Sequence, residues 1–212
     1  MAGSAPAPGT PPFTGVVLAG GASSRMGTDK ALVEVGGPPL VVIAARALID
    51  GGASRVVVVG GDATAFTALG LETLADLHPG EGPLGGIITG LRAASDPVVM
   101  ILACDMPAID GSTVAAIVAA LAAHPEADGA APLVGQRRQI LTAAYRRRVL
   151  PVLEQAYAAG ERAPRRALAG RALVAVGDLD PERLADVDRP EDLSRYAQPE
   201  QIPGATGPGA PG

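Results

Sequence analysis

The sequence is poor in residues that several specialised protein classes require. Its 212 residues include one cysteine, Cys104, three tyrosines, two phenylalanines and no tryptophan. A single cysteine cannot close an internal disulfide or build a cysteine-rich zinc site, so both kinds of scaffold are excluded. Because aromatic side chains are scarce, the hydrophobic core has to be built mainly from alanine, valine and leucine.

Positive charge and long apolar runs are also in short supply. The formal net charge is -5 at pH 7, which does not suit a general DNA or RNA binder, so we expect no nucleic-acid partner. No uninterrupted apolar run approaches about 18 residues, and we therefore expect no membrane span. The first twelve residues lack the basic and apolar regions of a secretion signal. These absences predict a cytoplasmic protein.

Proline, glycine and alanine dominate both ends of the chain, at residues 1–12 and 198–212. Neither end has enough apolar surface to offset the entropy lost on ordering, so we expect two flexible tails. The chain as a whole is 48% hydrophobic, which is typical of a globular protein. We therefore expect one folded domain over residues 13–197.

Short β-branched runs alternate with longer alanine-rich stretches in this domain. We expect strands at residues 15–18, 55–59, 98–103, 130–134, 140–144 and 173–176. We expect helices at residues 40–49, 84–94, 111–123, 146–159 and 190–197. Such alternation predicts the α/β class, as a three-layer Rossmann-like, doubly wound fold with a mostly parallel sheet. Ligands of such sheets bind at the carboxyl ends of the strands, here after residues 18, 59, 74 and 103.

The segment LAGGASSRMGTDK, residues 18–30, directly follows the first expected strand. Gly20 and Gly21 let an anion approach successive backbone N–H groups, and Arg25 and Lys30 add positive charge. The spacing fits neither the P-loop pattern G-x-x-x-x-G-K-[ST] nor the dinucleotide pattern G-x-G-x-x-G. We interpret the segment as a triphosphate-binding loop; the alternative is a Gly/Ser turn with two exposed basic residues.

Acidic residues follow the strand expected at residues 98–103 and recur near the C-terminus. Asp105 stands where a Mg²⁺ ion beside the phosphate loop would need an oxygen ligand, while Asp110 is better placed to cap the next helix. Asp188, two residues after Asp186, fits a metal ligand and a helix cap equally well. Cys104 fits a small buried residue better than a reactive thiol, because no histidine accompanies it in a known pattern.

Four stretches resemble the molybdenum cofactor guanylyltransferases, within the broader sugar-nucleotidyltransferase-like fold. They are LAGGASSRMGTDKA at residues 18–31, EGPLGG at 81–86, LACDMP at 102–107 and DVDRPEDL at 186–193. The Asp29–Lys30 pair is more typical of the guanylyltransferase branch than of the cytidylyltransferase branch. The resemblance covers essentially the whole expected domain and implies a sheet of the nucleotide-diphospho-sugar transferase type.

The resemblance implies transfer of GMP from GTP to the phosphate of molybdopterin, with release of pyrophosphate and with Mg²⁺ as cofactor. It also implies transient contact with other cofactor-biosynthesis proteins. The candidate catalytic residues are Arg25, Lys30 and Asp105. The candidate nucleotide-binding residues are Leu18, Ala19, Gly20, Gly21, Lys30, Asp76 and Asp105. The candidate metal ligands are Asp105 and Asp188.

Two departures from the family pattern leave alternatives open. The family often has asparagine at the end of the second strand, where this chain has Val59 followed by two glycines, so CTP remains an alternative to GTP. Arg137, Arg138 and Gln139 precede an expected strand and could reach an acceptor phosphate. The family commonly has proline near this point, so another phosphorylated or sugar acceptor remains open. A non-catalytic nucleotide-binding protein of the same fold is disfavoured by Lys30 and Asp105.

Overall fold

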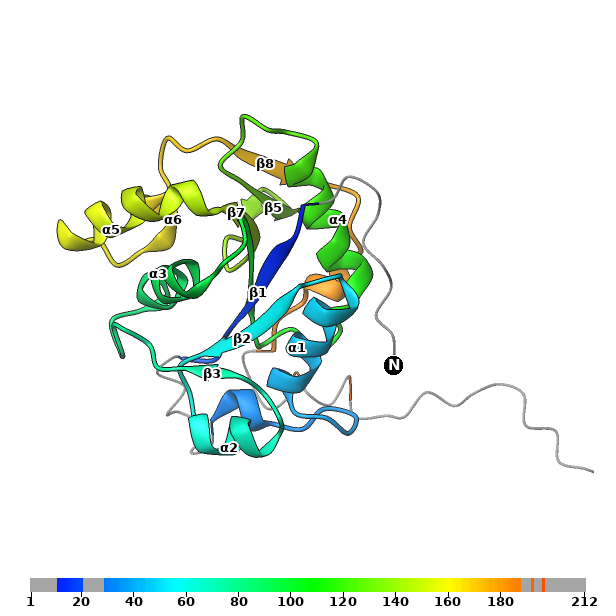
Figure 1. Ribbon diagram of the computed structural model, residues 1–212. Helices are drawn as coiled ribbons and strands as arrows, with labels where there is room; N and C mark the ends of the chain where they lie inside the picture. Colours follow the sequence, from blue (N-terminus) through cyan, green and yellow to red (C-terminus); the bar gives the residue numbers. More distant parts are fainter. Residues whose placement is uncertain (1–10, 21–28, 188–191, 193–195, 197–212) are drawn as a thin grey trace, which may run out of the picture.

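The computed structural model describes residues 11–20, 29–187, 192 and 196, and its centre is an eight-stranded sheet (Figure 1). The first four strands are β1 (Phe13–Leu18), β2 (Arg55–Val59), β3 (Thr73–Leu74) and β4 (Val98–Ala103). They are parallel and lie in the order β3-β2-β1-β4. The chain thus moves outward from β1 through β3 and returns to place β4 on the other side of β1. This reversal of strand order is where a ligand site is expected in a parallel sheet.

The other four strands extend the sheet beyond β4. They are β5 (Gly129–Val134), β6 (Arg137–Arg138), β7 (Thr142–Arg146) and β8 (Leu173–Val176). β7 runs antiparallel to β4 and to β5, and β6 is antiparallel to β5, whereas β8 is parallel to β5. The expected α/β class with a mostly parallel sheet is therefore confirmed, and each antiparallel strand pair of the described sheet involves β6 or β7.

Helices cover both faces of the sheet and complete the three layers (Figure 1). α1 (Leu40–Asp50) and α4 (Gly111–Ala122) pack together on one face, and α3 (Pro83–Ala93) and α5 (Leu150–Ala158) pack together on the other. The short helices α2 (Ala63–Ala68) and α6 (Pro164–Ala167) follow β2 and α5 along the chain. Among the described residues, no helix is long and apolar enough to cross a membrane.

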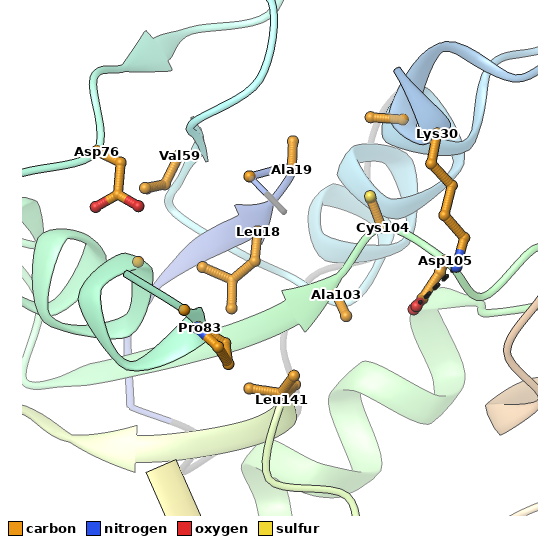
Figure 2. Close-up of a pocket in the computed structure, with 14 residues that line it drawn as sticks. Leu18, Ala19, Lys30, Val59, Asp76, Pro83, Ala103, Cys104, Asp105 and Leu141 are labelled. Atoms are coloured by element: carbon orange, nitrogen blue, oxygen red, sulfur yellow. Dashed lines mark hydrogen bonds and ion pairs between the residues drawn. The ribbon is translucent and has the colours of Figure 1, made fainter. Parts of the chain in front are cut away.

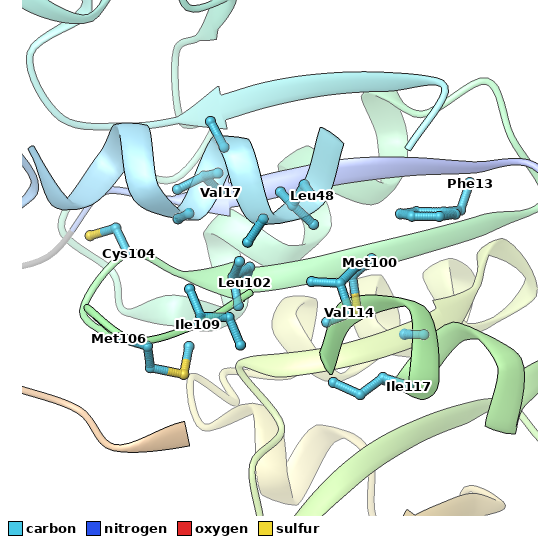
Figure 3. Close-up of a cluster of buried hydrophobic side chains, with 14 of the residues drawn as sticks. Phe13, Val17, Leu48, Met100, Leu102, Cys104, Met106, Ile109, Val114 and Ile117 are labelled. Carbon is cyan, nitrogen blue, oxygen red and sulfur yellow. The ribbon is translucent and has the colours of Figure 1, made fainter. Parts of the chain in front are cut away.

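The continuous apolar runs of the strands supply two cores, because successive side chains point to opposite faces. In β4, Met100 and Leu102 join the core beneath α1 and α4, while Val99 and Ile101 join the core beneath α3 and α5. Figure 3 shows the first of these cores. Phe13 lies in that core and is 1% exposed. Because the chain has few aromatic residues, aromatic packing contributes at only a few positions.

The structure corrects several expected boundaries. The strand expected at residues 140–144 is β7, shifted to Thr142–Arg146, because Tyr145 and Arg146 pair with Val99 and Val98 of β4. The helix expected at residues 146–159 therefore begins only at Leu150, where a proline in the first turn costs no internal hydrogen bond.

Other expectations were incomplete or lie outside the structure. The short elements α2, β3, β6 and α6 carry too few residues for a periodic pattern, and of these only a strand ending at residue 74 was anticipated. The helix expected at residues 190–197 falls almost entirely outside the described residues. Both proposed tails lie largely outside them as well, so the domain limits remain a prediction.

Candidate active site

A cavity of about 180 Å³ lies at the carboxyl ends of β1, β2 and β4 (Figure 2). The strand register brings these ends to one level, because Leu18 pairs with Val59 on one side and with Ala103 on the other. The residues implied as nucleotide-binding that line the cavity are Leu18, Ala19, Gly20, Lys30, Asp76 and Asp105. Gly21 and Arg25 lie outside the described residues, as does Asp188.

The wall formed by β1 and β2 consists of closely spaced backbone. The Ala19 N–H donates to the Val59 carbonyl at 3.0 Å. Gly60 has a φ of +77°, and a Cβ atom there would lie 2.9 Å from the Cα of Gly20. Val59 itself is 1% exposed and belongs to the hydrophobic core. Where the family often has an asparagine side chain, this chain therefore has a buried valine in the cavity wall.

Lys30 and Asp105 form an ion pair in this cavity. Lys30 Nζ lies 3.3 Å from Asp105 Oδ2, and the two side chains are 15% and 28% exposed (Figure 2). Lys30 comes from a short 3-10 helix, η2 (Lys30–Leu32), whereas Asp105 follows the end of β4. Residues 75 positions apart in the sequence thus place one ammonium and one carboxylate group side by side.

Asp29 fixes the segment that carries Lys30 through two hydrogen bonds, one to a neighbouring residue and one to a distant residue. One carboxylate oxygen of Asp29 accepts from the Ala31 N–H at 3.0 Å and so caps η2. The other accepts from the Asp62 N–H at 3.2 Å, in the loop after β2. An aspartate directly before a short helix is a recognisable capping signal, but the bond to Asp62 spans 33 residues and has no sequence signature.

Asp186 and Val187, in the described part of the acidic stretch near the C-terminus, lie near Asp105. The Val187 N–H donates to the Asp105 carbonyl at 2.9 Å. Asp186 and Asp105 both line a second cavity, described below. The described residues contain no cluster of three acidic, histidine or cysteine side chains that could hold a metal ion. They do offer the Asp105 carboxylate, and one protein carboxylate completed by water and phosphate oxygens suits Mg²⁺.

Asp76 stands across the cavity from the Lys30–Asp105 pair (Figure 2). It follows β3, and its Oδ1 accepts from the His78 N–H and from the Thr89 hydroxyl, each at 3.0 Å. The family resemblance implies Asp76 as a nucleotide-binding residue, whereas the sequence alone shows only a polar residue after a short strand. The structure places it in the same cavity as Lys30 and Asp105.

Cys104 also lines the cavity but does not have the properties of a nucleophile. Burial, with a further contribution from the negative charge of Asp105, raises the pKa of the Cys104 thiol to about 12. A thiol with that pKa stays protonated at neutral pH, and the thiolate is the reactive form. The prediction of a small, buried and unreactive residue is confirmed for its burial.

A second cavity of about 280 Å³ adjoins the first. The two cavities share four residues: Pro83, Ala103, Asp105 and Leu141. The polar side chains that line only the second cavity include Arg138, Gln139, Arg165 and Asp186. Arg165 donates from Nη2 to the Arg138 carbonyl at 3.0 Å. Arg137, grouped with Arg138 in the sequence analysis, does not line this cavity.

A cluster of polar and aromatic side chains lies next in sequence to residues of both cavity walls, although none of its members lines either cavity. Glu81 accepts hydrogen bonds from the Tyr157 hydroxyl and, at 2.8 Å, from Arg162 Nε. The Arg162 guanidinium lies 3.9 Å above the Tyr157 ring, and His78 packs against the same ring. The hydrogen bond from Tyr157 and the charge of Arg162 keep the pKa of Glu81 below its usual value. The cluster thereby ties the turn before α3 to the segment between α5 and α6.

Comparisons with known proteins agree with this geometry. The model of the MobA-like NTP transferase domain matches residues 15–176. A probable molybdenum cofactor guanylyltransferase from Chloroflexus aggregans is 40% identical over 71% of this chain and 73% of its own length. A molybdenum cofactor guanylyltransferase from Pseudomonas putida is 34% identical over 85% of this chain and 95% of its own.

A solved structure agrees at the level of the fold. Molybdopterin-guanine dinucleotide biosynthesis protein A from Archaeoglobus fulgidus matches with a TM-score of 0.71 and 24% identity. The match covers 87% of this chain and 96% of that protein. The sheet order, the cavity at its carboxyl edge and the family model lead to one assignment: the chain belongs to the family of MobA-like NTP transferase domains.

Proposed function

We propose that this nucleotidyltransferase transfers GMP from GTP to the phosphate of molybdopterin and releases pyrophosphate. The observation that carries the proposal is the placement of Asp105 in both of two adjoining cavities, with Lys30 beside it. A group transfer between two substrates needs two neighbouring sites that meet at the reacting atoms. The relatives named as molybdenum cofactor guanylyltransferases support the choice of nucleotide and acceptor.

The first cavity is the proposed nucleotide site. The backbone at Leu18, Ala19 and Gly20 would contact the nucleotide, and Lys30 would offset charge on the triphosphate. Gly21 and Arg25, the proposed continuation of the phosphate loop, remain predictions from the sequence. Asp76 would contact the nucleotide at the far side of the cavity from Lys30.

Asp105 is the proposed ligand of a divalent cation, for which we favour Mg²⁺. The chemistry of the site fits such an ion, because Mg²⁺ usually takes only one or two protein carboxylates. When bound, it would neutralise charge on the phosphate oxygens. The Val187 N–H donates to the Asp105 carbonyl, and Asp188 is the next residue in the sequence. Its role as a second metal ligand remains a prediction from the sequence.

The second cavity is the proposed acceptor site, where Arg138 and Arg165 supply positive charge. An oxygen of the acceptor phosphate attacks the α-phosphorus of GTP, the bond between the α-phosphorus and the bridging oxygen breaks, and pyrophosphate leaves with that bonding pair. A phosphate monoester has a second pKa of about 6 and is largely ionised at neutral pH. The reaction therefore needs no general base from the protein, and alignment and charge neutralisation are its main requirements.

The test is pyrophosphate release from GTP, CTP, ATP and UTP, each with Mg²⁺ and with or without molybdopterin. We expect release that requires molybdopterin and is fastest with GTP. Release with CTP and not with GTP would reject the guanine assignment, and no release with any pair would leave a non-catalytic binding protein. A cytoplasmic location and contacts with other cofactor-biosynthesis proteins are proposed on the family alone.

A further inference from the structure

Thr89 lies in the middle of α3, lines neither cavity and is 4% exposed. Its hydroxyl oxygen accepts from the Leu77 N–H at 3.1 Å and lies 3.0 Å from Asp76 Oδ1. It is also 3.0 Å from the Gly85 carbonyl, one helical turn earlier. A buried hydroxyl has one proton to donate, and a carboxylate is a stronger acceptor than a neutral carbonyl.

The hydrogen bonds from Thr89 and His78 engage the same oxygen of the Asp76 carboxylate. Both groups donate to Oδ1, and these two hydrogen bonds restrain the rotation of the carboxylate. The other oxygen, Oδ2, lies near Gly20 and Gly86, which line the first cavity: a Cβ atom would lie 4.0 Å from Oδ2 if built on Gly20 and 3.9 Å if built on Gly86. Asp76 thus directs its second carboxylate oxygen toward residues that line the first cavity.

We propose that Thr89 is a positioning residue for the nucleotide, acting through Asp76. The inference rests on the proposed nucleotide site and adds a residue outside it. Asp76 Oδ2 would accept from N–H or O–H donors of the base or ribose, and Thr89 sets the direction in which this oxygen points. Preorganised hydrogen-bonding groups bind better because less ordering is needed on binding.

The test measures the Kd of the protein for GTP, CTP and ATP in the presence of Mg²⁺ by calorimetric titration, and it needs no acceptor. Replacing Thr89→Val keeps the shape and removes the hydroxyl, and we expect the Kd of the preferred nucleotide to rise about 5- to 20-fold. Thr89→Ser keeps the hydroxyl and should stay within about twofold of wild type. Should Thr89→Val fail to fold, Thr89→Ala provides the same loss of the hydroxyl without added bulk.

A matched control comes from α4, where Thr113 is 5% exposed and donates to Asp110 Oδ1 at 2.8 Å, away from both cavities. Thr113→Val should change the Kd by less than about twofold, since it removes a comparable bond elsewhere. In an Asp76→Ala background, Thr89→Val should likewise have almost no further effect on the Kd. Equal effects of the two valine variants, or a full effect of Thr89→Val without Asp76, would overturn the proposal.

The outcome is separable from that of the proposed function. If the wild-type protein binds CTP more tightly than GTP, the guanylyl assignment fails, and the Thr89 comparison is then made with CTP. If Asp76→Ala leaves the Kd of every nucleotide unchanged, the positioning role of Thr89 is wrong even where GMP transfer is observed.

Discussion

At the scale of single residues, Asp105 occupies the position on which the proposed chemistry depends most. Its carboxylate lies beside Lys30 in one cavity and also lines the other, so it is the described acidic group common to both. Removing its charge should disable transfer without disturbing either core. This separation of activity from folding can be measured directly.

We expect Asp105→Asn to lower kcat for transfer by about 100-fold or more, because the cation that would neutralise the phosphates loses its carboxylate ligand. The Tm should stay within about 5 °C of wild type, since the side chain keeps its shape and lies outside both cores. The matched control is Asp128→Asn, which removes a carboxylate bonded to Arg148 far from the cavities. Wild-type rates for Asp105→Asn would refute the assignment.

Gly60 and Gly70 offer a second test at this scale. Their φ angles are +77° and +78°, but a Cβ atom on Gly60 would clash with Gly20, whereas one on Gly70 would meet nothing within 4 Å. Gly70→Ala should therefore cost only the backbone strain, about 1–2 kcal/mol of unfolding free energy.

Gly60→Ala should cost more than Gly70→Ala and should also raise the KM for GTP, because the Gly20 backbone has to move. Urea unfolding and steady-state kinetics on both variants provide the measurement. Equal unfolding free energies and an unchanged KM for GTP in Gly60→Ala would show that the contact between Gly60 and Gly20 does not shape the site.

At the scale of elements, α4 illustrates how local sequence determines a helix. Asp110 accepts from the Thr113 N–H at 2.9 Å and from the hydroxyls of Thr113 and Ser112. Burial raises the pKa of Asp110, but these hydrogen bonds outweigh it and leave the pKa lowered. A lowered pKa means that the ionised cap stabilises the fold above the pKa of the unfolded chain, about 3.9 for Asp.

Asp110→Ala should lower the unfolding free energy by about 1 kcal/mol at pH 7. The difference from wild type should shrink as the pH falls below about 4, because the cap in the wild-type protein is then protonated. Urea unfolding at pH 7 and at a series of acidic pH values tests both statements. A difference that grows on acidification would contradict the sign of the pKa shift.

Elements with strong periodicity could be predicted from the sequence, and short ones could not. β2 and β4 were expected with the bounds that they have, because each is a continuous β-branched or apolar run. β7 was misplaced by two residues because its start is set by pairing with β4, which is a contact between distant segments. The helix α2 has six residues, too few for an amphipathic pattern.

The placement of Lys30 and Asp105 in one cavity could be predicted, because each belongs to a motif that follows a strand. A motif can identify such residues because the carboxyl ends of parallel strands lie at the same edge of the sheet, where ligands bind. The hydrogen bonds that orient the site were not predictable. Asp29 bonds to Asp62 and Thr89 bonds to Asp76, and both contacts depend on how separate elements pack.

At the scale of the whole molecule, the two halves of the sheet border the two proposed substrate sites. The parallel strands β1 to β4 form the nucleotide side, and the antiparallel β6 and β7, with α6, border the acceptor side. Asp105 and Pro83 lie where the two cavities meet. Variants on the acceptor side should therefore affect one substrate and spare the other.

Replacing Arg138 and Arg165 together by glutamine should raise the KM for molybdopterin about tenfold, because two cations near the acceptor are lost. The KM for GTP should change by less than about twofold, since neither residue lines the first cavity. Arg137→Gln, on the same short strand but outside the cavity, is the control and should leave both constants unchanged. An equal rise in both KM values would indicate that the two cavities do not hold separate substrates.

The most direct measurement of the central claim follows the phosphorus atoms of GTP. The protein is incubated with Mg²⁺, molybdopterin and GTP radiolabelled at either the α- or the γ-phosphorus, and the products are separated. Nucleotidyl transfer would place the α-label in a guanine dinucleotide form of molybdopterin and the γ-label in pyrophosphate. Transfer of γ-label to molybdopterin, or its release as inorganic phosphate, would contradict nucleotidyl transfer at this site.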